Sequence, residues 1–224
     1  MLEKILAIYK PKGPTSNDIV QNIKRVVGNE KVGHAGTLDP LAEGVLVLGI
    51  GREATKKLNE VVRKEKEYLA KVKLGETSVT DDEEGGKTKI EVAEKPSRAD
   101  IERVLKSFLG KIKQVPPIYS AVKVNGKEAY KLARRGGKPL LLERCVEIKE
   151  IGILDYEWPH LDLRVVTGPG VYVRALARDI GEKLKTGAYL ANLKRTRVGN
   201  FTAEKALTLD EFKKQWLNLS SSKN

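Results

Sequence analysis

The sequence predicts an α/β protein of the α+β type, in which helices pack on a mixed, largely antiparallel sheet. Amphipathic helical segments and strand-like segments both occur along the 224 residues, but they do not alternate regularly as in a doubly wound parallel fold. The length is ample for a buried core. We expect one continuous domain over residues 1–216, followed by a polar tail over residues 217–224.

The first third of the chain predicts one helix and two strands. Residues 17–27 place five apolar side chains on one helical face, and Thr15 with Asp18 matches a capping box at the start. Residues 44–50 are continuously apolar over the length of a strand, which favours a strand buried on both faces. Apolar side chains alternate with others over residues 68–74, which indicates a strand with one face toward the core.

The remaining chain predicts short elements separated by turn residues. Ser97 can cap a helix that closes at Gly110, and the pair Asn125-Gly126 predicts a tight turn between a strand at 121–124 and a basic helical stretch through Arg135. The other predicted elements are strands at 146–154 and 161–167, a helix at 173–184, and a last helix opened by a capping box of Thr208 and Glu211.

The charge balance favours a polyanionic partner. Lys and Arg number 42 against 30 Asp and Glu, a formal net charge of +12. The bases cluster in two runs, Lys123, Lys127, Lys131, Arg134, Arg135 and Lys138, and then Lys194, Arg195 and Arg197. We expect these runs to contact the phosphates of a nucleic acid; the alternative is that they are solvated surface.

Several classes of protein are excluded or disfavoured by composition. A single cysteine excludes an internal disulfide framework, and two histidines without nearby cysteines give no metal-site spacing. No signal peptide and no apolar run approaching a membrane span are visible. We therefore expect a soluble, cytoplasmic protein without a metal, and nothing in the sequence indicates more than a monomer.

The most unusual segment is residues 33–44, which read GHAGTLDPLAEG. Glycines and a proline around one histidine and one aspartate describe a tightly bent loop that enters the apolar strand. Pro40 biases Asp39 away from helical geometry, and a carboxylate held on a rigid loop is a preorganised nucleophile or base. The alternative is that Asp39-Pro40 simply starts a turn.

This loop occurs with other motifs in a fixed order. KPKGPTS lies upstream at 10–16, KEY follows at 66–68, QVPPIYSA at 114–121, and GPGVYVRAL at 168–176. Together they resemble the TruB family of bacterial tRNA pseudouridine synthases over residues 4–210. The catalytic subunits of archaeal and eukaryotic box H/ACA particles share the core motifs.

The resemblance implies a role for particular side chains. It makes Asp39 the nucleophile, places Tyr68 against the target base as an aid to proton removal, and pairs Arg174 with Asp39, which keeps that carboxylate ionised and aimed. A core tyrosine is the alternative for Tyr68. The remaining implied positions are His34, inserted against the RNA loop, Tyr172, a substrate contact, Leu193, lining the uridine pocket, and the pair Lys10 and Pro11, with a more structural role.

The resemblance also implies an activity, conversion of uridine 55 in the T arm of tRNA to pseudouridine in an active-site cleft across the sheet. The target base must be flipped out of its stack, and the isomerisation requires no metal, nucleotide or redox cofactor. Two alternatives stay open: a synthase acting on another RNA, or a non-catalytic tRNA-binding or tRNA-folding module.

The sequence departs from the family pattern at three places. The usual C-terminal RNA-binding domain is not recognisable after the last predicted helix, Val79 stands where an acidic residue is common, and Ala35 replaces a common threonine.

Overall fold

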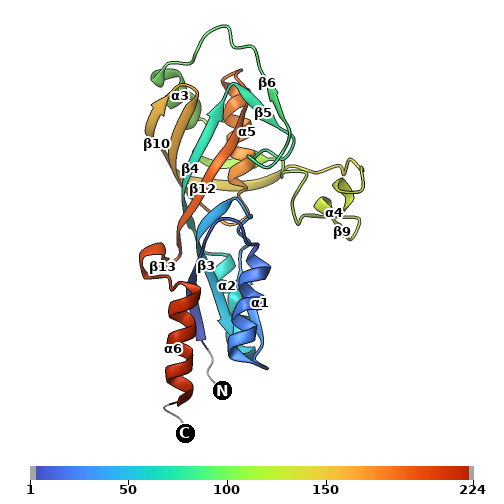
Figure 1. Ribbon diagram of the computed structural model, residues 1–224. Coiled ribbons are helices and arrows are strands. Elements are labelled where there is room, and N and C mark those ends of the chain that lie inside the picture. The colour runs from blue at the N-terminus through green and yellow to red at the C-terminus, as the bar shows by residue number, and fades with distance from the viewer. Residues whose placement is uncertain (1–3, 222–224) are drawn as a thin grey trace. The chain divides into compact units, whose positions relative to one another are not determined.

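The computed structural model describes residues 4–221 (Figure 1). The chain divides into two compact units: unit 1 comprises Met1–Tyr68 and Leu193–Asn224, and unit 2 comprises Leu69–Asn192. Unit 1 is therefore built from both ends of the chain. Two strands, β4 (Lys66–Leu74) and β12 (Ala188–Val198), run from one unit into the other.

Unit 1 is built around β3 (Ala42–Ile50). β1 (Lys4–Lys10) and β2 (Val32–Ala35) pair with it antiparallel, whereas β12 pairs with it in parallel. The other elements of the unit are α1 (Ser16–Val27), α2 (Arg52–Val62), β13 (Phe201–Thr202), a 3₁₀ turn at Ala203–Lys205 and α6 (Leu209–Ser221).

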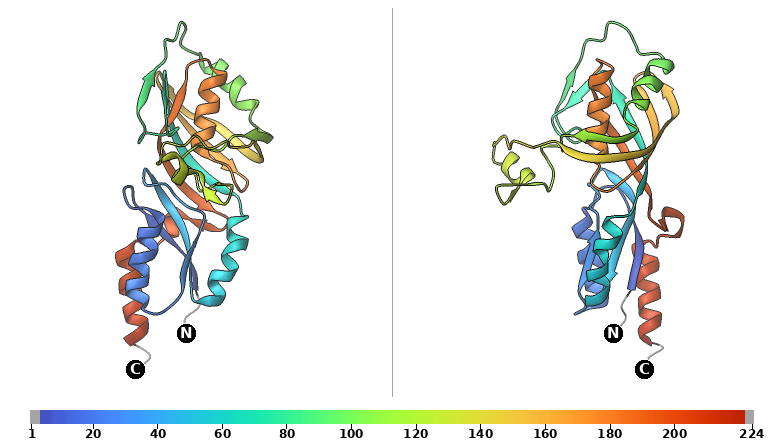
Figure 2. Two further views of the ribbon diagram at one scale, coloured as in Figure 1. Left: turned by 90° about the vertical axis from the view of Figure 1, so that its right-hand side faces the viewer. Right: turned by 180° about the vertical axis from the view of Figure 1, so that it is seen from behind.

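Helices cover both faces of β3, which explains why its sequence is continuously apolar. Leu46, Leu48 and Ile50 pack in one cluster with the buried faces of α1 and α6, while Val45 and Val47 point the other way, into a cluster with α2. The left view of Figure 2 shows α1 and α6 on one side of these strands and α2 on the other.

Unit 2 contains a sheet in the order β12-β4-β11-β10-β7, where β7 is Gly110–Gln114, β10 is Arg144–Glu157 and β11 is His160–Thr167. β10 is antiparallel to both β11 and β7. The unit also contains α3 (Arg98–Lys106), α5 (Val173–Lys183) and the small hairpin β5 (Glu76–Ser78) with β6 (Lys87–Lys89). Residues 115–143, here called the basic excursion, carry β8 (Lys123–Val124), β9 (Lys127–Glu128) and α4 (Ala129–Ala133) (Figure 1).

The predicted fold class is confirmed, since the sheet is mixed and mostly antiparallel, with helices packed on it. The capping box of α1 is present as predicted, with Thr15 and Asp18 bonded to each other's backbone. On β4, Tyr68 and Val72 are buried while Leu69 is 37% exposed, as the alternation predicts. The turn at Asn125 and Gly126 has φ of 50° and 80°, which suits a tight hairpin.

Some features of the fold were not predicted. Neither α2 nor β12 was recognised in the sequence, and α6 continues to Ser221, into the segment that was expected to be a polar tail. Within residues 4–221, no helix combines the length and the apolar character that a membrane span needs.

Candidate active site

The loop that carries Asp39 connects β2 to β3 in unit 1. It begins at Gly36, whose φ of +80° is the left-handed conformation that favours glycine. At its other end the Ala42 amide donates to the Asp39 carbonyl at 3.0 Å, and the Gly13 amide donates to the Pro40 carbonyl at 2.9 Å. The loop is therefore bonded to the β1–α1 connection as well as to its own strand.

Ser16 at the start of α1 fixes the middle of this loop. Its hydroxyl accepts from the Leu38 amide at 2.8 Å and donates to the Leu38 carbonyl at 2.9 Å. Both residues are buried, at 2% and 3% exposure. One side chain thus satisfies both backbone groups of the residue before Asp39, where water cannot replace it.

Arg195 fixes the beginning of the loop, and here the sequence-based interpretation was wrong. Arg195 was expected to contact RNA phosphates, but its side chain is only 1% exposed. Its guanidinium donates to the carbonyls of Val45 at 2.8 Å, Gly36 at 3.0 Å and Thr37 at 3.4 Å. The basic run at 194–197 is a strand, β12, so neighbouring residues face different surroundings, and Arg195 is the one that faces inward.

Two further cations are buried in unit 1. Lys10 is fully buried and donates to the carbonyls of Pro11 at 2.9 Å and Pro14 at 2.8 Å. Burial lowers the pKa of Lys10 to about 8, although attraction to Asp39 opposes the shift. Lys66 donates to carbonyls at the end of α2, and burial, together with repulsion from Arg195, lowers its pKa to about 8. Sequence reasoning missed Lys66, because a lysine at the start of a strand is usually exposed.

Among the described residues, no group of three or more His, Cys, Asp or Glu side chains could hold a metal ion. The charges that act on buried Lys10 are those of Asp39, Arg195, Asp18 and Glu43.

His34, Tyr68 and Leu193 also belong to unit 1. His34 lies in β2, and its Nδ1 is buried without a hydrogen-bond partner among the described residues. Burial and the charge of Arg195 lower the pKa of His34. Tyr68 is 6% exposed on the inward face of β4, and Leu193, also 6% exposed, stands opposite Ala42 in the β12–β3 pairing.

Arg174 and Tyr172 lie at the start of α5 in unit 2. The Arg174 guanidinium donates to the carboxylate of Asp82 at 3.1 Å and to the carbonyls of Tyr119 and Thr80 at 3.1 and 3.2 Å. Arg174 and Asp82 form a buried ion pair. Tyr172 exchanges two backbone hydrogen bonds with the side-chain amide of Gln114. Arg174 is thus held rigidly by the buried carboxylate of Asp82.

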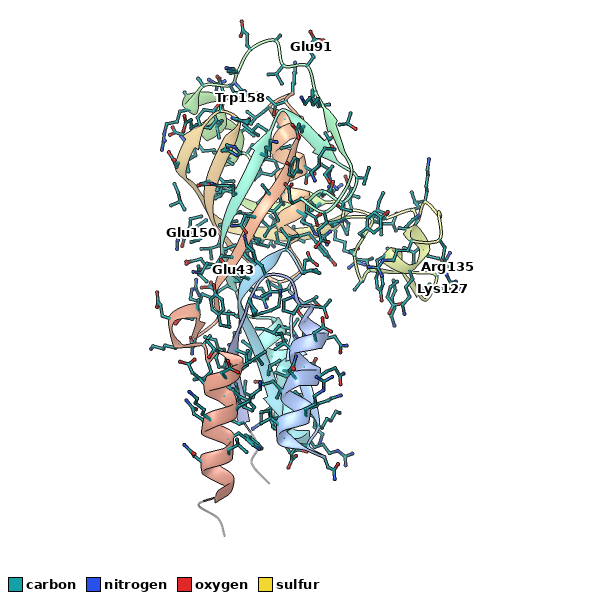
Figure 3. All side chains as sticks on the ribbon, in the orientation of Figure 1. Glu43, Glu91, Lys127, Arg135, Glu150 and Trp158 are labelled. Carbon is teal, nitrogen blue, oxygen red and sulfur yellow. The ribbon has the colours of Figure 1, made fainter. Side chains whose placement is uncertain are left out.

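The basic excursion exposes most of the predicted RNA-contacting bases. They are Lys123, Lys127, Lys131, Arg134 and Arg135, all of them exposed; Figure 3 labels Lys127 and Arg135. The Tyr130 ring lies near Lys131 and Arg134, at 5.8 and 5.5 Å from its centroid. Lys194 is half-buried, with its ammonium group 5.8 Å from the centre of the Tyr9 ring.

Comparison with known families assigns nearly the whole chain. Residues 24–173 match the N-terminal domain of the TruB family of pseudouridylate synthases, and residues 174–223 match a C-terminal domain of tRNA pseudouridylate synthase B. The second match starts in α5 and includes β12 and α6. No C-terminal domain was recognisable after the last predicted helix, whereas this match assigns residues 174–223 to one.

Curated relatives give the same result. The chain is 43% identical to tRNA pseudouridine synthase B of Parabacteroides distasonis, over 93% of this chain and 91% of the relative. It is 43% identical to the protein of that name from Clostridium kluyveri, over 93% and 72% of the two lengths.

Solved structures show the same fold. The chain is similar to one in a Cbf5-Nop10-Gar1 complex, with a TM-score of 0.75 and 29% identity, and to one in the archaeal box H/ACA sRNP Nop10-Cbf5 complex, with a TM-score of 0.70 and 28% identity. These similarities cover 98% of this chain, which spans 56% of the length of each of the two solved chains.

Proposed function

The chain belongs to the TruB family of pseudouridylate synthases, and on this basis we propose that it converts uridine 55 in the T arm of tRNA to pseudouridine, with Asp39 as the catalytic carboxylate. The observation that carries the proposal is the rigidity of the Asp39 loop. Each residue from 36 to 40 has a backbone group bonded to unit 1, through Arg195, Ser16, Gly13 or Ala42. A carboxylate held in this way needs little reorganisation when it reacts.

The proposed reaction is an isomerisation. The N1–C1′ bond of uridine breaks, the detached base turns, a C5–C1′ bond forms, and the C5 proton leaves to solvent while N1 gains a proton. Asp39 attacks or stabilises the reacting sugar or base, and the pocket must keep the free base from leaving. Tyr68, buried on β4, would offer its ring to the extruded base and assist removal of the C5 proton.

Arg174 has the proposed role of pairing with Asp39 and keeping it charged. Its bonds to Asp82, Thr80 and Tyr119 support this role, because they fix the position of the guanidinium before any substrate binds. Tyr172, two residues earlier, has the proposed role of a substrate contact.

We propose that exposed basic side chains supply the affinity for RNA and that an inserted side chain aids the flipping of the target base. The exposed lysines and arginines of the basic excursion, together with Lys194, would contact phosphates, which set register but not sequence. His34 would fill the stack vacated by the flipped base, and Leu193 would line the uridine pocket.

The test is release of tritium from a T-arm stem-loop labelled at C5 of uridine. The wild-type chain should release tritium without added metal or nucleotide, and Asp39→Asn should bind the same RNA without releasing it. Asp210→Asn is the matched control, because that carboxylate is 84% exposed on α6 and should be dispensable. Equal release by Asp39→Asn and wild type would overturn the role of Asp39.

The two alternatives correspond to other outcomes of the same experiment. Release from a different RNA, but not from the T arm, would indicate a synthase with another target. Tight tRNA binding without release from any RNA would indicate a non-catalytic module.

A further inference from the structure

We infer that Arg195 is a positioning residue for the catalytic loop: its guanidinium ties the backbone just before Asp39 to strand β3 and does not contact RNA. The inference deepens the proposed function and rests on it, because the loop matters only if Asp39 reacts.

The geometry of the guanidinium carries the argument. One side chain donates to Val45 inside β3 and to both Gly36 and Thr37 in the loop, so it joins the loop to that strand. Only a planar fork with several N–H donors can reach three carbonyls in fixed directions at once. A lysine ammonium would reach fewer of them and would fix none of their orientations.

The backbone of Arg195 is held as closely as its side chain. It stands opposite Gly44 in the parallel β12–β3 pairing, and a Cβ at Gly44 would lie 2.2 Å from the carbonyl oxygen of Arg195. Gly44 also has a φ of +110°. β12 therefore approaches the start of β3 at a place where only glycine fits, and this approach aims the arginine at the loop.

The charge of Arg195 indicates that it is more than packing. Lys10 and Lys66 are two further buried cations near Arg195, and its charge repels both. Burying a guanidinium beside like charges is unfavourable, and an apolar side chain would often stabilise such a site better. The three hydrogen bonds from the guanidinium to backbone carbonyls offset this unfavourable burial, and they align the loop.

The test compares Arg195→Lys and Arg195→Met with wild type in the full chain. Arg164→Lys is the matched control, since it makes the same replacement in an exposed ion pair with Glu150. Hydrogen exchange of residues 36–42, read by mass spectrometry, reports loop order without any turnover. The maximal rate and the affinity for a T-arm stem-loop, each at several salt concentrations, separate loop positioning from RNA contact.

We expect faster exchange confined to residues 36–42 in both variants. The maximal rate should fall about 10-fold for Arg195→Lys and about 100-fold for Arg195→Met, because small misplacements of a reacting group have effects of this size. RNA affinity and its salt dependence should stay at the wild-type values, and Arg164→Lys should behave as wild type throughout. Weaker RNA binding with a shallower salt dependence and unchanged exchange would overturn the inference, as would an unchanged maximal rate.

A measurement on the wild-type chain keeps the inference open to refutation if both variants fail to fold. An arginine-specific dicarbonyl reagent should leave Arg195 unmodified both with and without RNA. Modification that RNA prevents would show a surface contact and overturn the inference. If wild type forms no pseudouridine in any RNA, the proposed function fails, but the exchange data still decide whether Arg195 orders the loop.

Discussion

Replacing Ser16 by alanine should destabilise unit 1 strongly for such a small change. The substitution removes one hydroxyl that accepts from the Leu38 amide and donates to the Leu38 carbonyl at 2.8 and 2.9 Å. Because Ser16 and Leu38 are 2% and 3% exposed, both backbone groups would be left buried without a partner. An unsatisfied buried group costs about 1–3 kcal/mol, so leaving both groups without a partner should cost about 2–6 kcal/mol.

Urea unfolding measures this loss. For a urea m-value of about 3 kcal/mol/M, the midpoint should fall by about 1–2 M. Ser97→Ala is the control: it removes a hydroxyl that donates to the Asp100 carboxylate and accepts from the Asp100 amide at the exposed cap of α3, where the expected loss is about 1 kcal/mol. If Ser16→Ala costs no more than Ser97→Ala, the two bonds to Leu38 do not hold the loop, and the reasoning about its rigidity is refuted.

Three further predictions concern single side chains. Asp82→Asn removes the buried carboxylate that accepts from Arg174, so the free energy of unfolding, measured in urea, should fall by about 3–5 kcal/mol. A fall of less than about 1 kcal/mol would contradict a buried ion pair. Lys66 has a folded pKa of about 8 against an ordinary 10.5, so the unfolded chain binds more protons between these values and stability should gain from rising pH in that window. Lys66→Met should reduce this gain, and identical pH profiles of stability for variant and wild type would refute it. Lys131→Ala in the exposed basic excursion should weaken RNA binding and lower the salt slope by about 1, whereas an unchanged slope in a filter-binding titration would remove it from the interface.

The elements that the sequence predicted well are those with local signals. Nearby residues mark both ends of α1: the capping box of Thr15 and Asp18 marks its start, and Gly28 marks its end. By contrast, α2 follows Gly51 with no side-chain cap, and its buried Leu58 and Val61 stand among charged residues. Its apolar face was present in the sequence but lacked the start signal that made α1 recognisable.

Some residues of the candidate site are likewise recognisable from the local sequence, whereas others depend on distant partners. Asp39 could be selected from the sequence because glycines and Pro40 mark a bent loop, and the motif around it matches a known family. The burial of Arg195 could not be predicted, because the groups that accept its hydrogen bonds are backbone carbonyls about 150 residues away in the sequence. Every residue has such a carbonyl, so no residue type marks these acceptors. The partnership of Arg174 with Asp82 has the same origin, since the two lie 92 positions apart.

The discontinuity of unit 1 has a consequence for synthesis of the protein. Its first segment, Met1–Tyr68, carries Asp39, but the arginine that ties the loop and the α6 residue Phe212, which covers the buried face of α1, belong to Leu193–Asn224. A ribosome makes about 5–20 residues per second, so the N-terminal segment waits many seconds for these parts. A nascent chain that has not yet reached Arg195 therefore contains Asp39 without the guanidinium that ties its loop.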